Sequence, residues 1–76
     1  MAKLTPRQKV LREVLRKQPC SMRRLADEAG VSHARLVLAR DGDRNLTDES
    51  TRKVVDALRR WSAMCEEIAS KLEATL

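Results

Sequence analysis

The stretch from residue 48 to residue 76 contains neither glycine nor proline. Because a helix interior tolerates these two residues least, up to about 28 of these positions can form a single helix. At a rise of 1.5 Å per residue such a helix is ~42 Å long, whereas a compact domain of this chain length is ~30 Å across. The sequence therefore predicts either a break near Trp61 and Ser62 or a helix whose end projects from the domain and needs a partner.

Apolar residues in this stretch recur at alternating intervals of four and three positions. They are Val54, Leu58, Trp61, Cys65, Ile68 and Leu72. This spacing is a heptad seam, the pattern of helices that pair along one stripe. We expect Val54, Val55 and Leu58 to pack inward on the core. Two interpretations are open for Trp61, Cys65, Ile68 and Leu72. We favour a contact between the two copies of a homodimer. The alternative is that this part of the chain folds back onto the first helix.

The rest of the chain is divided by Pro6, Pro19, Gly30 and Gly42. Thr5 is suited to cap a helix, Pro6 to occupy its first position, and Gln8 to complete a capping box. Because apolar residues then recur on one helical face until Pro19, we predict a first helix over residues 6–17.

Two short helices follow. Ser21 is a suitable N-cap for a second helix that ends at Ala29, and Gly30 can adopt the left-handed conformation of a tight turn. Ser32 then caps a third helix over residues 33–40, and Thr47 or Asp48 caps the last one.

The composition favours an all-α fold. Hydrophobic residues make up 42% of the chain and Trp61 is its one aromatic residue, so the core must consist of aliphatic side chains and methionine. No segment alternates between apolar and polar residues as a half-buried strand does. We predict a small helical bundle of four or five helices with a long C-terminal helix.

Charge is distributed unevenly along the chain. Residues 1–40 contain ten basic and three acidic residues, whereas residues 41–76 contain six basic and eight acidic ones. The formal charges of the two parts are therefore +7 and −2, which gives the net +5 of the chain. A basic first part indicates contact with a polyanion.

Several function classes are disfavoured. The single histidine, His33, and the two cysteines, Cys20 and Cys65, have neither metal-ligand spacing nor a neighbouring nucleophile, so we expect no metal, no cofactor and no enzymatic activity. The chain is also too short for a large cleft that would bind a small-molecule substrate. With no apolar stretch of ~20 residues and no secretory signal, we expect a cytoplasmic protein with reduced cysteines and no membrane contact.

Residues 22–41 match the helix-turn-helix pattern. Ala26 is small where two helices cross closely, Gly30 allows the turn, and Leu25, Val31 and Leu36 form a shared apolar centre. In this arrangement the first turns of the third helix, residues 33–40, protrude and can enter the major groove of DNA.

The run Leu25-Ala26-Asp27-Glu28-Ala29-Gly30-Val31-Ser32 resembles the lambda-repressor-like (Xre/Cro-type) helix-turn-helix regulators and the lactose-repressor-type headpiece. The segment from Arg40 to Thr47 resembles the loop that precedes the fourth helix of the Xre-type proteins. The resemblance covers about residues 8–60. It implies a domain of at most five helices that docks as a dimer on two DNA half-sites.

The candidate contacts with double-stranded DNA come from the motif and from the arginines that flank it. They are Arg23, Arg24, Ser32, His33, Ala34, Arg35, Val37, Leu38, Arg40 and Arg44. Of these, His33, Ala34, Val37 and Leu38 occupy the positions that face the groove in the family. The arginines and the helix start at Ser32 are expected to contact phosphate, and Arg35 or Arg40 could instead contact a guanine edge.

Two departures from the family affect these assignments. Met22 stands where the family often has a glutamine that contacts the DNA backbone, and Val37 and Leu38 are apolar where polar residues are usual. Val37 and Leu38 either touch thymine methyl groups, or a slightly rotated helix buries one of them and turns Arg35 towards the DNA.

The sequence thus predicts a DNA-binding domain at residues 1–60 and a dimerisation element at residues 61–76. The predicted function is a sequence-specific transcriptional regulator of phage or mobile-element type, acting as a homodimeric repressor. The alternative is a helix-turn-helix module that binds another protein, such as an antitoxin or a component of a packaging complex.

Overall fold

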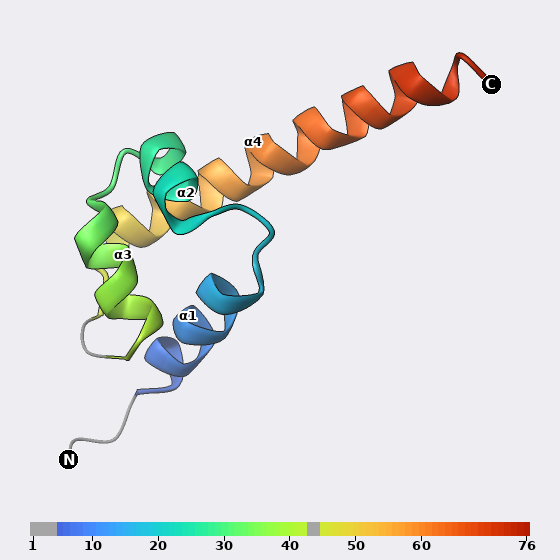
Figure 1. Ribbon diagram of the computed structural model, residues 1–76. Coiled ribbons are helices and arrows are strands. Elements are labelled where there is room, and N and C mark those ends of the chain that lie inside the picture. The colour runs from blue at the N-terminus through green and yellow to red at the C-terminus, as the bar shows by residue number, and fades with distance from the viewer. Residues whose placement is uncertain (1–4, 43–44) are drawn as a thin grey trace.

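The computed structural model describes residues 5–42 and 45–76, and within them the chain forms four helices and no strand. The helices are α1 (Pro6–Lys17), α2 (Met22–Ala29), α3 (His33–Arg40) and α4 (Asp48–Glu73) (Figure 1). The predicted all-α bundle with a long last helix is confirmed, and the bounds of the first three helices agree with the prediction.

A hydroxyl side chain begins each helix. The side-chain oxygens of Thr5, Ser21, Ser32 and Thr47 each accept a hydrogen bond from the backbone N–H three residues later, at 3.1–3.4 Å. The backbone N–H of Thr5 also donates to the Gln8 side chain at 2.8 Å, which completes the predicted capping box. Of the two candidates for the last cap, Thr47 takes the role.

A three-residue turn joins α2 to α3. Gly30 adopts φ 69° and ψ 36°, a left-handed conformation that side chains with a Cβ rarely adopt. The N–H of Val31 then donates to the carbonyl of Ala26 at 3.1 Å, which closes the end of α2. The turn reverses the chain so that α2 and α3 pack against each other.

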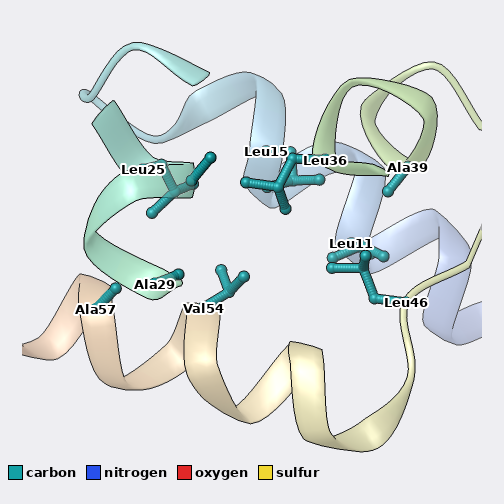
Figure 2. Close-up of a cluster of buried hydrophobic side chains, with 10 residues drawn as sticks. Leu11, Leu15, Leu25, Ala29, Leu36, Ala39, Leu46, Val54 and Ala57 are labelled. Carbon is teal, nitrogen blue, oxygen red and sulfur yellow. The ribbon is translucent and has the colours of Figure 1, made fainter. Parts of the chain in front are cut away.

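The core is aliphatic and draws on all four helices. α1 packs on α3, and α2 packs on both α3 and α4. Leu46, from the loop before α4, is also buried in this core. Figure 2 shows these side chains pointing into one common interior. The buried residues are Leu11, Leu15, Leu25, Ala26, Ala29, Leu36, Ala39, Leu46, Val54 and Ala57. Val31 and Leu58 pack against this core as predicted.

The last helix runs without a break through Trp61 and projects from the bundle. It contributes to principal extents of 54 × 20 × 18 Å, and every residue from Ser62 onward is exposed. In Figure 1 the orange and red part of α4 extends away from the other helices. The predicted alternative of a break near Trp61 and Ser62 is therefore wrong, and the alternative of a projecting end is confirmed. The end of α4 also does not return onto α1. Within the described parts of the chain, no helix is both long and apolar enough to cross a membrane.

Candidate nucleic-acid interface

One side of α3 is buried and the opposite side is exposed. Leu36 is fully buried and Ala39 is 2% exposed, so these two residues fix α3 to the core. His33, Ala34 and Arg35, in the first turn, are all exposed. The helix-turn-helix therefore presents the start of α3 outward, as Figure 1 shows at the edge of the bundle.

The two apolar candidates on α3 differ in exposure. Leu38 is 37% exposed and lies on the outward side, while Val37 is half-buried. Because Leu36 and Ala39 point to the core, Val37 and Leu38 lie on the two flanks of the outward face, and Leu38 is the more exposed of the two. Leu38 is thus the apolar residue that a ligand of this face would meet first.

Arg35 borders an open hollow between α3 and the start of α4. The hollow has a volume of about 270 Å³ and is lined by Arg35, Asn45, Leu46, Thr47 and Ser50. Three of its polar residues, Asn45, Thr47 and Ser50, were not among the predicted contacts. They lie beside the N-terminus of α4, where the carboxylates of Asp48 and Glu49 in the first turn already complement the helix dipole, so Arg35 is the cationic side chain of this lining. The helix-cap pattern at Thr47 was the sequence signal that marked this place.

The predicted contact arginines lie in different surroundings. Arg23 is exposed on α2. The guanidinium of Arg24 instead lies over the ring of Trp61, 4.7 Å from its centroid, so it joins α2 to α4. Arg40 is half-buried and its Nε donates to the carboxylate of Asp41 at 3.2 Å. Arg44 lies outside the described residues.

A second contact between α2 and α4 lies beside Trp61. The guanidinium of Arg60 donates to the backbone carbonyl of Glu28 at 2.9 Å. Trp61 is half-buried as a result of its packing at this junction. Trp61 therefore contributes to the fold of the single chain as well as to the seam that the sequence predicted.

The other three seam residues are uncovered. Cys65 is exposed, Ile68 is 58% exposed and Leu72 is 69% exposed. The structure adds Met64 and Leu76, two further exposed apolar residues on the same projecting segment. Sequence reasoning missed Met64 because a strict count of four and three positions leaves out the residues that flank a seam.

The opposite end of α4 is tied to α1 by charge. Arg7 donates through its guanidinium to the carboxylate of Asp48 and, at 2.8 Å, to the hydroxyl of Thr51. This hydrogen bond and the positive charge of Arg7 lower the pKa of Asp48 below its ordinary value. Asp48 also lies in the first turn of α4, where a negative charge complements the helix dipole.

Within residues 5–42 and 45–76 no three histidine, cysteine or acidic side chains are grouped so that they could hold a metal ion. Comparison of the chain with protein-family models, with curated proteins and with solved structures finds no match.

Proposed function

We propose that this protein binds double-stranded DNA in a sequence-specific manner and regulates transcription, as a repressor of phage or mobile-element type. The observation that carries the proposal is the orientation of α3. Leu36 and Ala39 hold the helix on the core, and its first turn, His33 to Arg35, is exposed in a net-positive chain. A short helix presented in this way is suited to the width of the major groove.

The proposed contacts divide into groups that position the protein and groups that read bases. Arg23, exposed on α2, is suited to phosphate, and its contribution is independent of sequence. His33 and Arg35 can donate to base edges, and Leu38 can touch a thymine methyl group. We leave Arg24 out of the proposed contacts because it stacks on Trp61.

We further propose that the protein acts as a homodimer, as its resemblance to the lambda-repressor-like regulators implies. The projecting part of α4 exposes Met64, Ile68, Leu72 and Leu76 along one segment, and large contiguous apolar patches on a monomer are uncommon. Two copies joined through this segment would present two α3 helices to two half-sites of cytoplasmic DNA.

Selection of binding sites from random duplexes tests the proposal. We expect a short recurring sequence with two related halves, and an affinity that falls with salt concentration. The slope of log K against log salt should be about −0.9 for each phosphate contacted. Recovery of no recurring sequence, together with an affinity that does not change with salt, would contradict DNA recognition.

A second candidate function rests on Leu38. Because this leucine is 37% exposed on the outward side of α3, the same surface could bind an apolar patch of another protein. The substitution Leu38→Gln separates the two functions. It should change base preference at one position of a DNA site, but it should abolish the binding of a protein partner, for which the loss of a central apolar contact is severe.

A further inference from the structure

An apolar groove lies between α1 and the first half of α4, apart from the α3 face. Its volume is about 350 Å³. Four valine and leucine side chains, Val10, Val14, Val55 and Leu58, line it together with the edges of the core. Val10 is 60% exposed and Val14 37% exposed, so the groove opens to solvent although its lining is almost entirely hydrocarbon. Arg7, which is ion-paired with Asp48, also lines the groove.

The same chain carries an apolar ridge of a kind that fits this groove. The segment from Met64 to Leu76, which we call the tail, consists of the projecting end of α4 and the three residues after it, and it exposes Met64, Ile68, Leu72 and Leu76. The tail extends straight away from its own bundle, so it cannot reach its own groove without a break in α4 (Figure 1). We propose that each tail docks in the α1–α4 groove of a second copy of this chain, so that two copies exchange tails.

The position of the groove sets the direction of the pairing. The groove lies beside residues 51–58 and the tail begins six residues further on, at Met64. Val54 and Ile68 are each seven residues from Trp61 in the heptad seam. An antiparallel pairing of the two α4 helices, with its two-fold axis at Trp61, therefore places Ile68 of one copy opposite Val54 of the other. Both tails then occupy grooves at the same time, as a closed two-fold dimer requires.

The charges of the two segments favour this pairing over a parallel one. In α1 five residues are basic and one is acidic, whereas the tail contains three acidic residues and one basic residue. An antiparallel exchange brings each acidic tail beside a basic α1. A parallel pairing would instead place the two tails side by side, with their acidic residues Glu66, Glu67 and Glu73 in mutual repulsion, and would leave both grooves open.

The inference rests on the dimer of the proposed function and is independent of its DNA contacts. Its test is the mass of wild type and of each variant in solution, measured by light scattering at the same protein concentration. Each mass is compared with the 8.6 kDa of the monomer. We expect wild type to be a dimer and both Val10→Glu, in the groove, and Ile68→Glu, in the tail, to be monomers. Val10→Leu keeps the groove apolar and Ser70→Glu adds the same charge to an exposed site outside the seam, so both should remain dimers.

An equimolar mixture of Val10→Glu and Ile68→Glu provides a sharper test. One intact tail and one intact groove remain in such a mixed pair, so part of the dimer should return. A monomeric wild type would overturn the dimer and the groove together. A dimeric wild type with a dimeric Val10→Glu would overturn the groove alone and would leave a dimer formed by the tails.

The native Cys65 tests the direction of pairing. In a parallel pair the two Cys65 residues face each other, whereas in the antiparallel pair they lie about 12 Å apart along the helix axis, too far for a disulfide. We expect the variant Cys20→Ala, which leaves Cys65 as its one cysteine, to stay uncrosslinked under mild copper–phenanthroline oxidation while it remains a dimer. Rapid formation of a covalent dimer through Cys65 would overturn the antiparallel exchange.

Discussion

The guanidinium of Arg24 in α2 lies over the ring of Trp61 in α4, 4.7 Å from the ring centroid. This contact is found at the point where α4 leaves the bundle, because every residue after Trp61 is exposed. The hydrogen bond from Arg60 to the carbonyl of Glu28 lies at the same junction. The direction in which the tail projects is therefore set by contacts between α2 and α4 as well as by the aliphatic core.

The substitution Trp61→Ala should lower the free energy of unfolding by about 1–3 kcal/mol, less than for a fully buried tryptophan because Trp61 is half-buried. Arg24→Ala should cost about 0.5–1 kcal/mol from the loss of the cation–π contact. Urea unfolding of both variants and of the double variant measures their coupling. Arg23→Ala, at the exposed neighbouring position, is the control and should change stability by less than about 0.5 kcal/mol. Strictly additive effects of the two substitutions would show that Arg24 and Trp61 do not interact.

Gly30→Ala should lower the free energy of unfolding by about 1–2 kcal/mol, the cost of a left-handed conformation for a residue with a Cβ. Nothing lies within 4 Å of the position that a Cβ would occupy, so the whole cost is in the backbone. For a domain of this size a loss of 1 kcal/mol lowers the melting temperature by about 4–8 °C. Gly30→Asn should cost less than Gly30→Ala, because asparagine tolerates this conformation better. Equal melting temperatures for Gly30→Ala and wild type would mean that the turn has another conformation in solution.

The helices and their caps were predictable because their causes are local. Thr5, Ser21, Ser32 and Thr47 each bond to a backbone N–H three residues away, and Gly30 ends α2 through its own backbone conformation. Signals of this kind lie within a few positions of one another, so they can be read without knowledge of the tertiary structure.

The features that join distant segments were not predictable in the same way. The sequence does not show that Arg24 and Trp61, which are 37 positions apart, lie in contact. For this reason the sequence predicts a DNA contact for Arg24. The half-burial of Val37 depends on the rotation of α3 about its axis, which the packing of Leu36 and Ala39 determines. The groove beside Val10 lies between α1 and α4, which 30 residues of the chain separate.

Stability should depend on pH through Asp48. Since Arg7 lowers the pKa of this carboxylate in the folded chain, the ion pair stabilises the fold above the ordinary pKa of 3.8 and is lost as the pH falls through the lower folded value. The difference in unfolding free energy between wild type and Asp48→Asn should thus be constant above about pH 5 and shrink below pH 4. In an Arg7→Met background, which removes the partner, the same substitution should show a smaller dependence on pH. An undiminished dependence there would assign the effect to the dipole of α4 instead of Arg7.

Arg35→Ala should weaken binding to the selected DNA site by about 1–3 kcal/mol, or roughly 5- to 150-fold, without a change in the mass of the protein in solution. Arg35 is exposed in the first turn of α3 and borders the hollow at the start of α4, so it can reach either a base edge or a phosphate. The two roles have different signatures. Loss of a base contact relaxes the preference at one position of the site and leaves the salt slope unchanged, whereas loss of a phosphate contact reduces the slope by about 1 and weakens all sequences alike.

The matched control for this measurement is Arg59→Ala, which removes an exposed arginine from α4, outside the helix-turn-helix, the α1–α4 groove and the tail. Both variants lose one positive charge, so the long-range attraction of the chain for a polyanion falls equally in the two. A loss of affinity confined to Arg35→Ala therefore reports a contact made at the α3 face. Equal affinities of the two variants would remove Arg35 from the interface, because the difference in charge would then be the whole effect.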